Sequence, residues 1–137
     1  MTDEPVNQHQ VRSMVRDFYA KHGLPVRTSA GLVFDPGEVE QMRALLAEEV
    51  GELYSAIDRG DLLKIVDGLA DVVYVIYGMS LQYGVDLDRA IAAVHHSNMT
   101  KEDSVGPWAT GTPRKVARGD DYMPPDLGIA MDGNERA

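Results

Sequence analysis

Hydrophobic residues recur at three- and four-residue steps through the first 100 positions, which is the spacing that amphipathic helices show. The pattern predicts four helices. Their expected limits are about Val6 to Lys21, Asp35 to Gly60, Asp61 to about Tyr83, and Asp86 to about Met99. The long central segments are the most strongly periodic, so they are expected to form the body of the domain.

The boundary of the second helix carries several start and stop signals. Asp35 can cap the helix, Pro36 suits its first position, and Glu38 stands three residues after the cap as in a capping box. Gly60 suits the end of the same helix. The connections that follow are short, which favours antiparallel neighbours. The sequence therefore predicts an all-α fold, an antiparallel four-helix bundle.

The periodicity stops after Lys101, where glycine and proline recur and aromatic residues are scattered. We expect residues 1–101 to form a helical domain and residues 102–137 an irregular C-terminal arm of the same domain. A short hairpin around Thr110 to Val116 is one expectation within that arm. The arm packs on the bundle or on a partner subunit in one interpretation, and it is a disordered tail in the other.

The composition narrows the classes of partner. The chain has 137 residues, a formal net charge of −9 and no cysteine, so disulfides and thiolate metal sites are excluded. The negative charge disfavours binding to nucleic acid polymers or to anionic membranes. No apolar run reaches the roughly 20 residues that span a bilayer, and the N-terminus lacks a signal peptide pattern. We expect a cytoplasmic protein.

An acidic residue stands in the most apolar helix. Asp71 lies in the run from Leu69 to Tyr77, and a charge in apolar surroundings is costly unless it is paired or binds a metal. Asp67 lies one turn earlier on the same face. The preceding helix offers a second carboxylate ridge, made of Glu48, Glu49 and Glu52. Antiparallel packing would bring the two ridges face to face.

Carboxylates alone suit hard ions such as Mg²⁺, Mn²⁺ or Ca²⁺. No calcium-binding loop is present, and the paired Glu-x-x-His motifs of a di-iron bundle are missing. Mg²⁺ held by protein carboxylates usually also meets substrate phosphates, and Asn98 and Lys101 at the end of the fourth helix could bind a nucleotide. Alternatively, the glutamates are a solvated helix face and Lys101 is a solvated helix terminus.

Taken together, these motifs resemble the all-α nucleoside triphosphate pyrophosphohydrolases, the group that contains MazG, phosphoribosyl-ATP pyrophosphohydrolase and the dimeric dUTPases. The resemblance rests on Glu48-Glu49-Val50-Gly51-Glu52, on the acidic helix Asp67 to Val75, and on His95-x-Ser97-Asn98-x-x-Lys101. It covers nearly the whole chain. One position departs from the group, because Gly68 stands where many members carry a glutamate.

The resemblance implies a MazG-like, oligomeric fold and Mg²⁺-dependent cleavage between the α- and β-phosphates, which gives a nucleoside monophosphate and pyrophosphate. Mn²⁺ is expected to substitute for Mg²⁺. Glu48 would act as the base that activates water. The metal would be held by Glu49, Glu52, Asp67 and Asp71.

For the substrate, the resemblance implies that Lys101 meets a phosphate and that Asn98 meets the sugar or base, with Lys64 and Tyr74 lining the pocket. A homodimer or homotetramer would complete that pocket. Base preference stays open, with a house-cleaning role on deoxynucleotides such as dUTP as one expectation. Phosphoribosyl-ATP hydrolysis and a non-catalytic helical interaction module that binds a basic partner are the alternatives.

Overall fold

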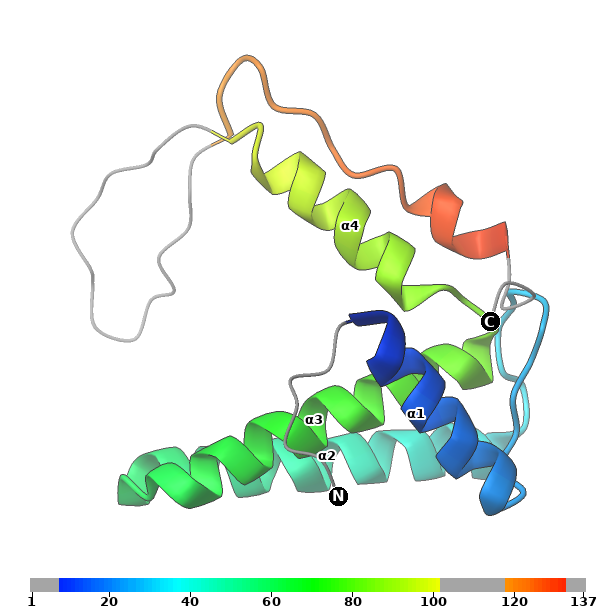
Figure 1. The fold of residues 1–137 in the computed structure, drawn as a ribbon, viewed down its shortest axis with the longest axis vertical. Coiled ribbons are helices and arrows are strands. Elements are labelled where there is room, and N and C mark those ends of the chain that lie inside the picture. The colour runs from blue at the N-terminus through cyan, green and yellow to red at the C-terminus, as the bar shows by residue number, and fades with distance from the viewer. Residues whose placement is uncertain (1–7, 102–117, 133–137) are drawn as a thin grey trace.

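The computed structural model describes residues 8–101 and 118–132 (Figure 1). Within these ranges the chain is all-α, with no strand. The helices are α1 (Gln8–Lys21), α2 (Pro36–Arg59), α3 (Leu62–Tyr83), α4 (Leu87–Asn98) and the short 3₁₀ helix η1 (Leu127–Asp132). The all-α prediction with four main helices is confirmed. The hairpin expected near residues 110–116 lies outside the described residues.

The helix boundaries follow the local signals in the sequence. The Asp35 carboxylate accepts a hydrogen bond from the Glu38 N–H at 3.2 Å, and Gly60 ends α2 with a positive φ of 65°. Asp61 caps α3 and Asp86 caps α4 in the same way. Local capping chemistry therefore sets the ends of α2 and α3 and the start of α4.

Helices α2 and α3 form a long antiparallel pair, and α1 crosses α3 (Figure 1). The pair packs closely at Gly68, because a Cβ built there would lie 3.2 Å from the Leu53 Cα. The core between α1 and α3 is small. It consists of Val15, Tyr19, Tyr77 and Leu81.

Helix α4 inclines away from the α2–α3 pair instead of lying along it (Figure 1). It contacts α1 and η1. A buried hydrogen bond of 2.6 Å from the Tyr77 hydroxyl to Asp88 fixes its first turn to α3. The C-terminal segment runs beside α4, since Asp86 N–H donates to the Ala130 carbonyl at 2.9 Å and the Ser97 hydroxyl donates to the Met123 carbonyl at 2.6 Å.

The linker between α1 and α2 is held by an ion pair. Both Nη atoms of Arg27 donate to the Glu38 carboxylate, at 2.6 and 2.7 Å, and the Gln82 amide donates to it at 3.2 Å. The Arg27 hydrogen bonds lower the pKa of Glu38. This contact joins the linker to the first turn of α2 and the last turn of α3.

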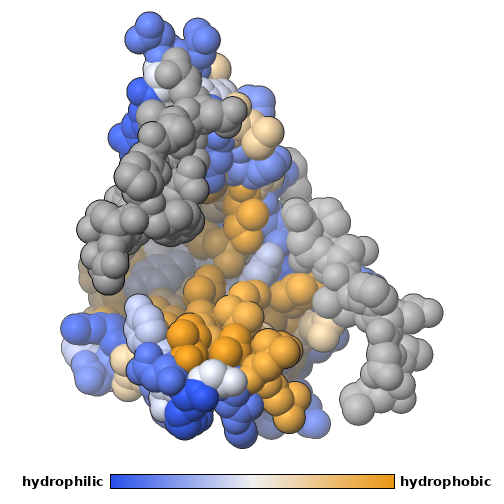
Figure 2. Space-filling model, turned by 90° about the vertical axis from the view of Figure 1, so that its left-hand side faces the viewer, coloured by the Kyte–Doolittle hydropathy of each residue, from blue (hydrophilic) through white to orange (hydrophobic). Residues whose placement is uncertain are grey.

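A continuous apolar stripe on α3 faces away from the rest of the chain. Its members are spaced four and three residues apart and are all exposed: Leu62, Val66, Leu69, Val73 and Ile76. Figure 2 shows hydrophobic residues gathered on the face at the hairpin end of α2 and α3. No helix in the described part of the chain is long and apolar enough to cross a membrane.

Candidate functional site

The α2–α3 pair brings the five predicted carboxylates into one electrostatic neighbourhood. Burial raises the pKa of Glu49, and the nearby negative charges raise it further. In decreasing order of effect, these charges belong to Asp71, Glu52, Glu48 and Asp67. Negative charges from both α2 and α3 therefore act on Glu49.

Glu49 is the most constrained of these groups. Its Oε2 atom is buried and has no hydrogen-bond partner within the described residues. Such an atom typically costs ~1–3 kcal/mol unless something satisfies it. Asp71 is half-buried, whereas Glu48, Glu52 and Asp67 are exposed. A cation at this place would satisfy the buried oxygen and offset the repulsion among its neighbours.

The donor set suits Mg²⁺, because it consists of carboxylate oxygens, the ligands that hard divalent ions take. In residues 8–101 and 118–132, no three acidic or histidine side chains already converge closely enough to enclose an ion. Three of the five carboxylates are exposed and can rotate toward the buried Glu49 oxygen. The residues therefore fit a magnesium site whose ligands must gather around the ion.

Gly68 has a packing reason to lack a side chain. It is buried against Leu53, and any Cβ would crowd both the backbone and the side chain of that residue. A side chain at this position would need Leu53 to shift away from it. Asp67 stands beside it and is exposed, so Asp67 and Asp71 are the carboxylates that α3 offers to the α2 ridge.

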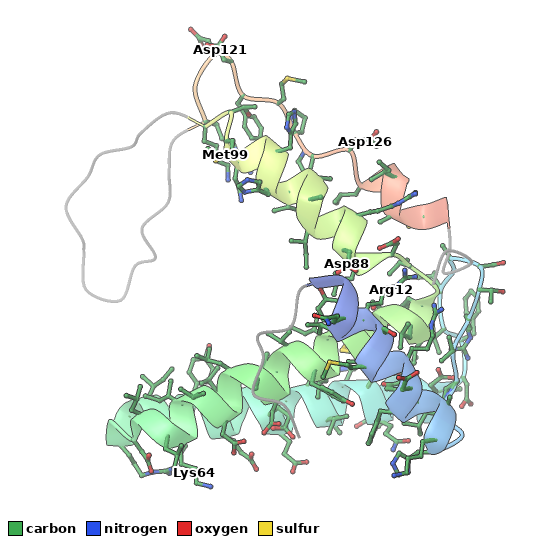
Figure 3. All side chains as sticks on the ribbon, viewed as in Figure 1. Arg12, Lys64, Asp88, Met99, Asp121 and Asp126 are labelled. Carbon is green, nitrogen blue, oxygen red and sulfur yellow. The ribbon has the colours of Figure 1, made fainter. Side chains whose placement is uncertain are left out.

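A cavity of about 240 Å³ adjoins the carboxylates at the hairpin end of the pair. Lys64, a predicted pocket residue, lines it together with Glu52 and Asp67. Figure 3 shows Lys64 near that end, on the side of the pair away from α4. That Lys64 lines the substrate pocket stays a prediction, and its place in this cavity is compatible with it.

Ser55 and Arg59 line the same cavity and were not predicted from the sequence. They follow Glu52 by three and seven residues, a spacing that places all three side chains on one helix face. That spacing could have found them. The Arg59 Nη1 donates to the Ser55 hydroxyl at 2.5 Å.

Tyr74, another predicted pocket residue, faces α1. Its ring packs edge-on against Phe18, with 5.6 Å between the ring centroids. Burial raises its pKa, and the charge of Asp17 adds to this effect. Tyr74 follows Asp71 by one helical turn, so it lies between the acidic ridge and the α1 surface.

Asn98 and Lys101 lie at the far end of α4. Figure 3 labels the adjacent Met99 there, remote from Lys64 and from the α2–α3 pair. Thr100 helps to fix this end, because its hydroxyl accepts a hydrogen bond from the Met123 N–H at 2.9 Å. One copy of the chain therefore does not bring Asn98 and Lys101 to its own carboxylates.

Comparison with known proteins places the chain in a family. The family model described as phosphoribosyl-ATP pyrophosphohydrolase matches residues 15–98. A mimivirus protein, uncharacterized protein L479 of Acanthamoeba polyphaga mimivirus, is 38% identical over 78 residues. That match covers 55% of this chain and 31% of the viral protein, so the chain spans about a third of the length of this relative.

The matched region runs from α1 to the end of α4 and includes all five carboxylates. It is more than half of the chain. The chain therefore belongs to the phosphoribosyl-ATP pyrophosphohydrolase family, one of the all-α families of nucleotide pyrophosphohydrolases.

Proposed function

We propose that this protein is a Mg²⁺-dependent nucleoside triphosphate pyrophosphohydrolase that cleaves between the α- and β-phosphates. The observation that carries the proposal is the buried Glu49 oxygen, which lacks a partner in the described part of the chain. It lies among four further carboxylates that raise the Glu49 pKa. A site that concentrates negative charge in this way is suited to divalent ions and, through them, to polyphosphates.

Glu49, Glu52, Asp67 and Asp71 would hold the metal, with Mn²⁺ able to replace Mg²⁺. Bound there, the ion would screen the triphosphate and stabilise the charge that develops on the leaving oxygen. Glu49 and Asp71, which are both half-buried, would provide the fixed part of the ligand set. The exposed Glu52 and Asp67 would close on it from opposite helices.

Glu48 is the proposed general base. It is exposed on α2 directly beside Glu49, so it can reach water without being a metal ligand. Glu48 would accept a proton as the water oxygen forms a bond to the α-phosphorus. The bond from that phosphorus to the α–β bridging oxygen breaks, and pyrophosphate leaves with the electron pair.

A second copy of the chain would complete the substrate pocket. Met99, which stands between Asn98 and Lys101 in the sequence, lies away from the α2–α3 pair (Figure 3), and the apolar stripe on α3 is exposed. A homodimer or homotetramer that covers the stripe would allow the α4 end of one copy to reach the acidic ridge of another. Asn98 would then meet the sugar or base, Lys101 a phosphate, and Tyr74 and Lys64 the walls of the pocket.

Phosphoribosyl-ATP is a second candidate substrate, favoured by the description of the family model. Phosphoribosyl-ATP carries the same triphosphate as a nucleoside triphosphate, so the carboxylates of α2 and α3 would bind both substrate classes in the same way. The base and sugar contacts decide between them. A panel that contains phosphoribosyl-ATP, canonical nucleotides and modified nucleotides therefore tests the substrate class.

The proposal is tested by incubating the protein with Mg²⁺ and this panel and identifying the products by chromatography. We expect a nucleoside monophosphate and pyrophosphate. Glu49→Gln and Asp71→Asn should abolish turnover, while Glu40→Gln, a change of an exposed glutamate on the same helix, should not. Release of orthophosphate, or full activity in the first two variants, would contradict the proposal.

A further inference from the structure

We infer that the cavity at the hairpin end of α2 and α3 binds the terminal phosphates of the substrate, the part that leaves as pyrophosphate. Arg59 and Lys64 would be the residues that receive them. This inference rests on the proposed function and adds a direction to it. The polyphosphate would lie along the α2–α3 pair, with its terminal end toward the hairpin and its nucleoside toward the start of α2.

The lining of the cavity combines two kinds of group. Glu52 and Asp67, two proposed metal ligands, lie on the side of the acidic ridge, and Arg59 and Lys64 supply two positive charges. A substrate phosphate in this cavity would contact the metal held by Glu52 and Asp67 on one side. On the other side it would contact Arg59 and Lys64. The cavity lies next to the proposed place of cleavage, so no other site is needed to hold the pyrophosphate that leaves.

The cations are available to a ligand. Within the described residues, no ion pair joins Arg59 or Lys64 to a carboxylate, although both line a cavity that contains two. Arg59 uses one donor on Ser55, and the planar guanidinium has further donors that match phosphate oxygens. Lys64 adds a compact charge that can follow a phosphate.

Gly68 contributes an uncharged part of the cavity lining. It lines the cavity and lacks a side chain, because Leu53 packs against it. A carboxylate at this position would place another negative charge beside the phosphates. In this chain, the lining at Gly68 carries no charge, and direct contacts from Lys64 on α3 and Arg59 on α2 would supplement the metal.

The inference predicts a difference between ligands with and without terminal phosphates. Arg59→Gln should weaken binding of an α,β-methylene triphosphate analogue by roughly tenfold to hundredfold, as expected for loss of charge-assisted hydrogen bonds. Binding of the matching nucleoside monophosphate should not change. Lys64→Gln should act in the same direction, and Arg59→Lys should recover part of the loss. Arg43→Gln is the control, because Arg43 is an exposed arginine near the other end of α2.

The measurement is isothermal titration with Mg²⁺ present, using the analogue, the monophosphate and inorganic pyrophosphate, with melting curves to verify folding. Equal affinity of wild type and Arg59→Gln for the analogue and for pyrophosphate would overturn the inference. An equal loss of affinity for the analogue and for the monophosphate would also overturn the inference, because it would indicate that Arg59 has a structural role. If Arg59→Gln fails to fold, Lys64→Gln decides by the same comparison. The proposed function fails separately, if the wild type cleaves no nucleotide.

Discussion

Glu49 has a raised pKa because it is buried and surrounded by negative charges. In the unfolded chain its pKa should be about 4.3, so the folded protein holds this proton more tightly. The metal-free protein therefore gains stability from Glu49 below that value and loses it as the pH rises through the raised folded-state pKa. The charged form of Glu49 is therefore less favourable in the folded, metal-free protein than in the unfolded chain.

This cost leads to a prediction for Glu49→Gln. The variant should melt at a higher temperature than wild type at pH 7 in EDTA, because it removes the charge that burial and the neighbouring carboxylates disfavour. It should also lose the part of the pH dependence that Glu49 causes. Circular dichroism melts between pH 4.5 and 8 measure both effects, with Glu40→Gln as the unshifted control. A metal-free Glu49→Gln protein that melts below wild type would contradict this account.

The acidic residues could be found from the sequence, but the burial of Asp71 was overestimated. The apolar neighbours of Asp71 suggested a core position, yet Asp71 is half-buried, and Val73 and Ile76 are exposed. Apolar neighbours do not distinguish a core from an uncovered surface. Of the two cations in the cavity, Lys64 was predicted and Arg59 was missed, although its seven-residue spacing from Glu52 places both side chains on one face of α2.

The elements were largely predictable, because local chemistry sets their ends. Asp35, Asp61 and Asp86 cap their helices, and Gly60 and Gly84 end α2 and α3 in the left-handed region. The inclination of α4 was not predictable. It depends on contacts between distant residues, such as the hydrogen bond from Tyr77 to Asp88 and the packing of residues 118–132 along α4.

The two glycine caps differ in their surroundings, and this gives a prediction at the scale of elements. Gly60 and Gly84 have φ values of 65° and 67°, but a Cβ at Gly84 would collide with the Ser29 carbonyl, whereas nothing lies near one at Gly60. Gly60→Ala should therefore cost about 1 kcal/mol, from the left-handed conformation alone. Gly84→Ala should cost more, because the linker at Ser29 must also move.

Urea unfolding of both glycine variants measures this difference. The expected order of stability is wild type, then Gly60→Ala, then Gly84→Ala. Equal losses in the two variants would show that Ser29 does not press on the turn that joins α3 to α4.

For the whole molecule, the exposed stripe on α3 is the surface through which the proposed self-association would occur. Exposed apolar patches of this kind mark interaction sites, and Leu69 lies on the side of α3 opposite Asp67 and Asp71. A partner that covers the stripe would therefore leave the acidic ridge open to substrate. Asn98 and Lys101 lie far from the carboxylates of α2 and α3 in the same chain (Figure 3). In the proposed assembly, a second copy would supply these two residues to the site.

This assembly predicts that wild type is a dimer or larger at micromolar concentration and that Leu69→Asp shifts it to the monomer. Nucleotide hydrolysis should fall when the partner is lost, because Asn98 and Lys101 of one copy would no longer reach the α2 and α3 carboxylates of another. Light scattering after size-exclusion chromatography measures the mass. The control is Leu32→Asp, at a leucine that is 72% exposed in the linker, and it should leave the assembly intact. A monomeric wild type would contradict the interpretation.

The most direct test of the central claim is calorimetric titration of the protein with a non-hydrolysable triphosphate, with Mg²⁺ and with EDTA. If the carboxylates of α2 and α3 hold the metal that binds the polyphosphate, wild type should bind the analogue tightly only with Mg²⁺. Asp71→Asn should lose that binding while keeping its fold. Equal binding of the analogue in EDTA, or unchanged Mg²⁺-dependent binding by Asp71→Asn, would contradict the account.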